Sequence, residues 1–314
     1  MSDNCLWVLG EALIDCVAQA DGSLQTMLGG SPFNVACAAA MQGVEVGYLN
    51  SLSTDVFGQA LAAKLSQCGA TALRPRSPKP TSLAVVHIDQ GQPSYGFYRD
   101  GIADRDYNAE DIVSLLKKHP AGVLHTGSLM AMPPENHKVM HVIQFAKALG
   151  WTISIDINLR TRVAYDLPAY LEAVHKMAAL ADWLKASDED MQLLGMNDVS
   201  FDKAETLASH WRSLGCSRVA LTFGDQGAWL QVDDAHAQGP AVCVELVDSV
   251  GAGDTFWATC LAEWLQLPDW RGSVEAQAHI ALTLQKALSA AAFNCAHQGC
   301  TPPTREQLAY LQQP

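Results

Sequence analysis

Short apolar runs alternate along the chain with longer segments whose apolar residues recur at helical spacing. In one such segment, Ala204 to Leu214, the residues Leu207, Trp211 and Leu214 share a face. This alternation predicts an α/β fold with a mostly parallel sheet and helices on both faces. The runs predicted to be buried strands are Leu6 to Leu9, Val46 to Leu49, Val123 to His125, Trp151 to Ile155, Trp183 to Leu184 and Val219 to Phe223.

Two segments interrupt the rhythm, Cys16 to Met27 and Thr81 to Tyr98. The second shows strand-like alternation, and no crossover helix follows either segment. We therefore expect antiparallel strands outside the main sheet, forming a small β-sheet lid inserted at about residues 11–27 and 81–101. No repeat or interdomain linker stands out, so a single domain is expected over residues 1–314.

The composition supports a large core and excludes some partners. The chain has 314 residues, of which 49% are hydrophobic, enough for one large or two modest domains. Its 20 basic and 33 acidic residues give a net charge of −13 without a basic block, so nucleic acid is not an expected partner. The longest stretch free of charged residues, Gly22 to Val44, contains several glycines and a proline, so no membrane span is expected.

Cysteine usage indicates the compartment. The chain has 9 cysteines, an odd number, and no Cys-x-x-Cys pair. Neither a disulfide framework nor a zinc site is suggested by this pattern. We therefore expect a protein of the reducing cytoplasm.

A glycine-rich segment near residue 250 has the features of an anion-binding site. Gly251, Ala252 and Gly253 are predicted to lie between a strand and a helix from Thr255 to Leu265. Unpaired amides at a helix start attract anionic oxygen, and Asp254 at the rim could take a proton from an attacking hydroxyl. The alternative is a tight glycine turn with Asp254 as a first-turn helix carboxylate.

A second glycine-rich segment precedes a predicted alanine-rich helix that ends near Gln42. Gly29 and Gly30 would let a polar ligand approach the main chain, and Asn34 offers a donor and an acceptor to a polyol. The alternative is an ordinary turn before a helix with Pro32 in its first turn.

Together these segments resemble the signatures of the ribokinase/PfkB family of carbohydrate kinases, in their expected order and separation. The runs G-G-S-P-F-N and D-S-V-G-A-G-D-T-F carry the resemblance, which spans the whole chain. The N-terminal G-E-A-L-I-D and the Y-G-F-Y-R-D-G-I-A-D stretch look most like bacterial fructokinases. The resemblance implies a ribokinase-like α/β fold.

The resemblance also implies roles on the sugar side of the site. Asp254 matches the catalytic base for a sugar hydroxyl, with Gly251, Ala252 and Gly253 as the anion hole. Phe97 and Arg99 match lid residues placed against substrate; Arg99 could instead be a solvated surface charge. The positions that match sugar-binding residues are Asp15, Gly29, Gly30 and Asn34.

On the nucleotide side, Asp156 to Arg160 is similar to a D-x-N-x-R element whose arginine, here Arg160, reaches toward the transferred phosphate. A guanidinium suits phosphate oxygens, although a surface salt bridge is the alternative. A core strand followed by a turn would also account for residues 222–227. The positions implied to hold ATP are Ser187, Thr222, Gly224, Gly227 and Asn294.

Two cation sites follow from the resemblance. Where the family has a glutamate that organises magnesium water, this chain has Asp190, one methylene shorter, and the neighbouring Glu189 could substitute. Asp248 and Val250 match positions that bind a monovalent cation in many relatives. A requirement for potassium stays open at this point.

The sequence thus predicts a magnesium- and ATP-dependent kinase that converts D-fructose to fructose 6-phosphate. The alternatives are 2-keto-3-deoxygluconate, whose carboxylate would suit Arg99 and Arg160, and a sugar or nucleotide sensor without turnover. The G-x-G-x-x-G and G-x-x-x-x-G-K-[ST] nucleotide loops are absent from the sequence. A homodimer paired through the lid is expected, because an exposed sheet is stabilised by pairing.

Overall fold

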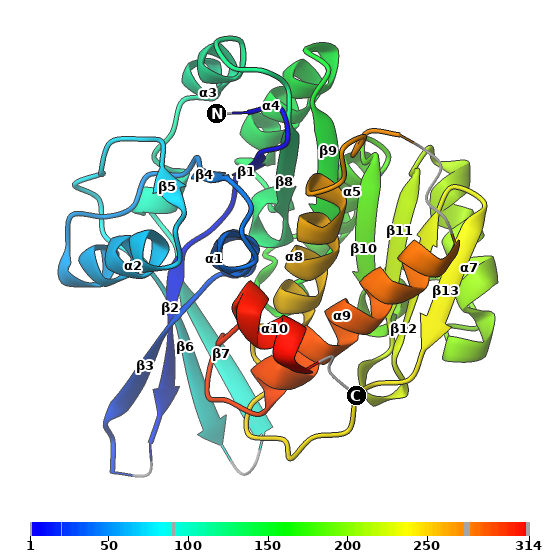
Figure 1. The fold of residues 1–314 in the computed structure, drawn as a ribbon. Coiled ribbons are helices and arrows are strands. Elements are labelled where there is room, and N and C mark those ends of the chain that lie inside the picture. The colour runs from blue at the N-terminus through cyan, green and yellow to red at the C-terminus, as the bar shows by residue number, and fades with distance from the viewer. Residues whose placement is uncertain (1, 20, 90–91, 273–276, 312–314) are drawn as a thin grey trace.

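The main sheet sets the framework of the protein (Figure 1). The computed structural model describes residues 2–19, 21–89, 92–272 and 277–311, and within them nine strands form this sheet in the order β13-β12-β11-β10-β9-β8-β1-β4-β5. The strands are β1 (Leu6–Val8), β4 (Val46–Tyr48), β5 (Thr71–Ala72), β8 (Val123–Gly127), β9 (Thr152–Asp156), β10 (Trp183–Ser187), β11 (Arg218–Thr222), β12 (Ala228–Val232) and β13 (Ala235–Gly239).

The strands from β5 to β11 are parallel, and the edge strands β12 and β13 are antiparallel. All six predicted buried strands are present, and the predicted fold class is confirmed. Because parallel strands buried on both faces have no polar side, their sequences appear as continuous apolar runs.

Helices cover both faces of the main sheet and enclose two hydrophobic cores (Figure 1). One face carries α1 (Ser31–Met41), α2 (Val56–Gln67), α8 (Ala252–Leu265) and α9 (Gln277–Cys295). The other carries α3 (Ala109–Leu116), α4 (Asn136–Ala148), α5 (Leu167–Ala178) and α7 (Ala204–Ser213). The short α6 (Asp188–Leu193) continues from β10, and α10 (Arg305–Leu311) lies against α9. No helix among the described residues is long and apolar enough to cross a membrane.

A small second sheet projects beyond the main one, and we call it the lid (Figure 1). It pairs β2 (Leu13–Ala18), β3 (Leu24–Gly29), β6 (Ser82–Asp89) and β7 (Gln92–Tyr98) in the order β3-β2-β6-β7. Residues 20, 90 and 91, which fall within the expected lid segments, lie outside the described residues.

The expectation of purely antiparallel pairing in the lid is wrong at one place. The pairs β2–β3 and β6–β7 are antiparallel hairpins, but β2 and β6 pair in parallel. Two hairpins that leave the main sheet in the same direction meet through their first strands, and these strands then run the same way.

Candidate active site

The acid predicted to act as a base lies where two helices begin side by side. Asp254, in the first turn of α8, is buried, and its carboxylate faces the first turn of α1. The Ser31 hydroxyl donates to Oδ1 at 2.7 Å, and the Asn34 amide donates to Oδ2 at 2.8 Å. These two bonds fix the orientation of the carboxylate, so the two glycine-rich segments form one site.

The N-terminus of α8 depends on glycine. Gly251 caps the helix with φ 78°, in the left-handed region, and a Cβ there would lie 2.6 Å from the Sγ atom of Cys300. Two expectations are wrong at this point. The helix begins at Ala252 rather than Thr255, and no strand lies directly before the glycine segment, because β13 ends at Gly239 and residues 240–248 are irregular. Glycine disfavours helix, so Gly253 concealed the first turn in the sequence.

The first turn of α8 offers free amides. Within the described residues, the N–H groups of Gly251, Gly253 and Asp254 have no acceptor, whereas Ala252 donates to the Ser249 carbonyl at 3.2 Å. Unpaired amides at a helix N-terminus favour negative charge. The first turn of α8 therefore presents a set of free amide donors, although Ala252 differs from its neighbours; that they form an anion hole stays a prediction.

Burial and neighbouring charges act on Asp254 in opposite directions. Burial raises the pKa of its carboxyl, because a desolvated carboxylate is unfavourable. The hydrogen bonds from Asn34 and Ser31, and the positive charges of Lys185 and Arg160, lower it. These four groups therefore favour the ionised form that a base requires.

Asp15 closes the lid side of the site. Its carboxylate lies against Gly29, where a Cβ would be 2.3 Å from Oδ2, so a larger residue there would displace the Asp15 side chain. Gly30 has φ 108° and passes equally close to the backbone of Glu11. Burial, with Asp254 and Asp248 nearby, raises the pKa of Asp15 to about 6, and Arg160 opposes the shift.

Arg160 follows β9 and is exposed. Its guanidinium donates to the Leu159 carbonyl at 3.0 Å, and among the described residues it forms no ion pair with an acidic side chain. The alternative of a surface salt bridge is therefore not observed. Its charge lowers the pKa of both Asp15 and Asp254, so it lies within electrostatic reach of each acid.

The two lid candidates differ in their surroundings. Phe97 is half-buried and packs against the core on the face of the main sheet that carries α3, α4, α5 and α7. Arg99 is buried and donates to Asp104 and to the Ser82 hydroxyl, each at 3.0 Å. The alternative of a solvated surface charge at Arg99 is wrong, since Asp104 neutralises it inside the protein.

Ser187 and Asp190 cap the start of α6. The Ser187 backbone and hydroxyl donate to Asp190 Oδ2, and the Leu159 amide donates to Oδ1 at 2.7 Å. Asp190 thereby ties the loop that carries Arg160 to the end of β10. Both of its oxygens already accept hydrogen bonds.

The turn after β11 contains the next predicted nucleotide residues. Thr222 ends the strand and is half-buried, and open space surrounds Gly224. Gly227 has φ 121°, and a Cβ there would lie 2.0 Å from the Gly239 carbonyl oxygen. Gly227 is thus required by the packing of the β-hairpin itself.

Asn294 does not reach the protein surface. It is fully buried; its amide donates to the Val250 carbonyl at 2.7 Å, and its oxygen accepts from the Thr301 amide at 2.8 Å. Asp248 accepts from the amides of Val250 and Gly299. These bonds hold the loop that leads into the anion hole, so the structure shows Asn294 supporting that loop.

Sequence reasoning missed Lys185, a buried lysine on β10. Its ammonium donates to both oxygens of Asp156 at 3.0 Å. A charged residue in an otherwise apolar strand is the signal that could have indicated it. Ser31 was likewise quoted within a motif but given no role, because its partner Asp254 is 223 residues away.

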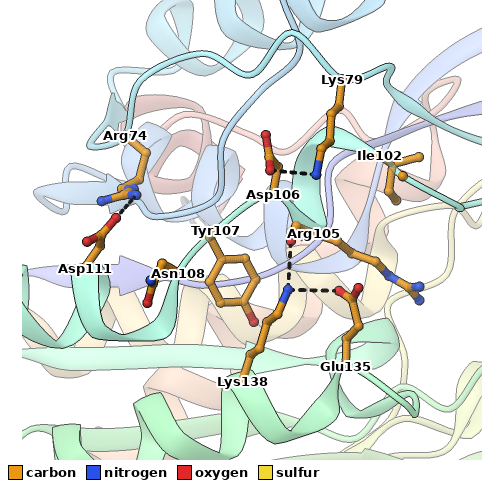
Figure 2. Close-up of a pocket in the computed structure, with 11 residues that line it drawn as sticks. Arg74, Lys79, Ile102, Arg105, Asp106, Tyr107, Asn108, Asp111, Glu135 and Lys138 are labelled. Carbon is orange, nitrogen blue, oxygen red and sulfur yellow. Dashed lines mark hydrogen bonds and ion pairs between the residues drawn. The ribbon is translucent and has the colours of Figure 1, made fainter.

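A separate cavity of about 390 Å³ lies between α3, α4 and the loop after β5 (Figure 2). None of the predicted site residues lines it. Its ion pairs are Arg74–Asp111, Lys79–Asp106 and Lys138–Glu135, at 2.9, 2.8 and 3.4 Å. Three of the four basic side chains that line the cavity are thus paired with acidic ones, and Arg105 is the fourth.

Comparisons with known proteins agree with this geometry. The model for pfkB family carbohydrate kinase matches residues 4–307. A fructokinase from Rhizobium leguminosarum bv. trifolii is 31% identical over 81% of this chain and 77% of its own length. A fructokinase from Vibrio alginolyticus is 30% identical over 85% of this chain and 86% of its own length.

Solved structures show the same fold. A fructokinase with bound ATP from Xylella fastidiosa superposes with a TM-score of 0.84 at 26% identity, covering 99% of this chain and 98% of that one. Aminoimidazole riboside kinase from Salmonella enterica shares the fold with a TM-score of 0.80 at 23% identity, covering 98% and 99%. With the family match over nearly the whole sequence and the paired helix starts around Asp254, this chain belongs to the pfkB family of carbohydrate kinases.

Proposed function

We propose that the protein transfers the γ-phosphoryl group of ATP to the primary hydroxyl of D-fructose, giving fructose 6-phosphate. One observation carries the proposal: the Asp254 carboxylate is held by Ser31 and Asn34 beside free amides of α8. The relatives named fructokinase, at 31% and 30% identity, support the choice of sugar.

The sugar would bind between the lid and α1. Asp15 presents a half-buried carboxylate, and Gly29 and Gly30 expose main chain without side chains. Asn34 keeps its carbonyl oxygen for a sugar hydroxyl, because its amide nitrogen is used by Asp254. A polyol with several hydroxyls fits this mixture of acceptors and bare backbone.

The transfer step uses Asp254 as general base. The ionised carboxylate accepts the proton of the primary hydroxyl, whose oxygen then attacks phosphorus in line. Negative charge spreads over the phosphoryl oxygens, and the amides of Gly251 and Gly253, together with the Arg160 guanidinium, stabilise it. The amides need no reorganisation, because the helix already orients them.

The nucleotide would lie along the ends of β10 and β11. Open space around Gly224 and the half-buried Thr222 fit that use. Two residues would shape this surface, Ser187, which caps α6, and the tightly packed Gly227. Asn294 would contribute indirectly, by donating a hydrogen bond to the Val250 carbonyl.

The cation assignments stay predictions. The bonds that Asp190 accepts from Ser187 and Leu159 do not fit a direct magnesium ligand. ATP itself supplies phosphate oxygens to magnesium, which commonly keeps several waters. Asp248 and the Val250 carbonyl remain the proposed place for potassium.

One structural feature bears on the choice between sugars. A 2-keto-3-deoxygluconate kinase would use a free cation against the substrate carboxylate. Arg99, one of the two candidates for that cation, is neutralised by Asp104 inside the protein. Arg160, the other candidate, forms no ion pair with an acidic side chain among the described residues, so only one of the two cations remains free for a keto acid.

A coupled ADP-release assay over a panel of ketoses, aldoses and 2-keto-3-deoxygluconate tests the proposal. We expect the highest kcat/KM with D-fructose, and a kcat roughly 10²- to 10⁴-fold lower with the Asp254→Asn variant. Faster turnover of 2-keto-3-deoxygluconate than of D-fructose would show that the keto acid is the substrate. Tight binding of sugar and ATP without any ADP release would instead establish a sensor.

We further propose a homodimer paired through the lid, working in the cytoplasm. Leu24 and Tyr98 on the lid are 49% and 64% exposed, which supports pairing with a second copy. The odd number of cysteines and the absence of a Cys-x-x-Cys pair from the sequence support a reducing compartment. Light scattering of the native protein and of a Leu24→Lys variant tests the dimer: the variant should be a monomer, and a monomeric native protein would refute it.

A further inference from the structure

A buried ion pair lies directly beneath the anion hole. Lys185 on β10 and Asp156 at the end of β9 are 5% and 1% exposed, and the ammonium contacts both carboxylate oxygens at 3.0 Å. Two charges buried at this depth need a reason, because desolvation offsets much of their attraction. An apolar pair would fill the same space without that cost.

The position of the ammonium suggests the reason. A Cβ on Gly253 would lie 3.3 Å from Lys185 Nζ, so the ammonium packs against the backbone of the first turn of α8. That turn carries the free amides and, one residue later, Asp254. The positive charge therefore lies behind the place where negative charge would collect during phosphoryl transfer.

We propose that Lys185 is a positioning residue for phosphoryl transfer: held by Asp156 against Gly253, its ammonium keeps the Asp254 carboxylate ionised and ready to accept the sugar proton. The inference rests on the proposed function. It adds to that function a residue that touches neither substrate.

The surrounding charges agree with this role. Burial opposes the charged form of Lys185, but Asp156, Asp190 and Asp254 raise its pKa overall, so the ammonium stays charged. Burial raises the pKa of Asp254 and Lys185 lowers it. The groups that face Asp254 from the elements packed around it are Ser31 and Asn34 on α1, Asp15 on β2, Asp156 and Arg160 around β9, Lys185 on β10 and Cys300 after α9.

The sign of the effect follows from these charges. Removing the ammonium removes a positive charge that favours the carboxylate, so the pKa of Asp254 rises. The acidic limb of the profile of kcat/KM against pH then moves to higher pH. Removing Asp156 while keeping the ammonium moves the limb to lower pH, because one competing negative charge is lost.

The experiment records pH profiles of kcat/KM for the native enzyme and for Asp156→Asn, Lys185→Met and the double variant. We expect Lys185→Met to shift the acidic limb upward by roughly 1 pH unit or more and to lower kcat more than it changes the KM for sugar. Asp156→Asn should shift the limb downward.

The double variant guards against a folding defect, since an uncharged pair of similar volume is commonly tolerated. Compared with Asp156→Asn alone, it isolates the charge at position 185 and should shift the limb upward. The inference would be overturned if Asp156→Asn and the double variant had their acidic limbs at the same pH. It would also be overturned if Lys185→Met and Asp156→Asn shifted the limb in the same direction. Failure of the native enzyme to phosphorylate any sugar would instead refute the proposed function.

Discussion

At the scale of single residues, the site depends on carboxylates whose environments differ. Asp254 is buried and held by two side-chain donors, whereas Asp15 is half-buried and lies on the lid strand β2. Under the proposed function, the first would move a proton and the second would hold sugar hydroxyls. Two substitutions separate these roles.

Asp254→Asn should lower kcat by roughly 10²- to 10⁴-fold, because a positioned general base contributes about that factor. The amide keeps the shape of the carboxyl, so binding of ADP by calorimetry should change little. A variant whose kcat stays within a few-fold of the native value would remove Asp254 from the mechanism.

Asp15→Asn should raise the KM for sugar roughly 10- to 100-fold, as expected for losing hydrogen bonds to a charged acceptor. The native carboxyl has its pKa raised to about 6 by burial. Below that pH it takes up a proton and accepts fewer hydrogen bonds, so the native KM should rise as pH falls through about 6. The variant should lack this rise; an identical pH dependence in both proteins would contradict the role.

At the scale of elements, the sequence predicted the central strands well and the helix starts less well. Buried parallel strands are continuous apolar runs, which local sequence displays. The first turn of α8 was missed because Gly253 hides its helical pattern. Lys185 and the contact of Ser31 with Asp254 were missed because their partners lie far away in the chain.

The hairpin of β11 and β12 offers a matched test of glycine packing. Gly224→Ala meets open space and should lower the free energy of unfolding by roughly 1 kcal/mol, the cost of a left-handed residue with a Cβ. Gly227→Ala also meets the Gly239 carbonyl, so a loss of roughly 3 kcal/mol is expected. Urea unfolding of both variants measures the difference, and equal losses would show that the hairpin relaxes.

At the scale of the whole molecule, a buried ion pair connects the lid to the main domain. Arg99 lies just after β7 and forms a buried ion pair with Asp104. The fully buried Glu11 lies near this pair. Burial raises the pKa of Glu11, and the Arg99 charge opposes that rise. The lid is therefore anchored by charge at its base.

Arg99→Met should lower the free energy of unfolding by roughly 3 kcal/mol, because it leaves Asp104 buried without a counter-ion. The double variant Arg99→Met with Asp104→Asn should be less destabilised than the single one. Denaturant titrations of both variants check this, and a double variant that is the less stable of the two would refute the anchor.

The paired starts of α1 and α8 also affect when the site can form while the polypeptide is being translated. Asn34 is made early and Asp254 late, and β1 lies between β4 and the later β8, so the interior of the sheet waits for downstream sequence. Under the proposed function, a polypeptide translated only as far as α1 would contain the glycines that face the sugar but lack the base. Phosphotransferase activity would then require translation through α8, and products truncated before Asp254 should be inactive.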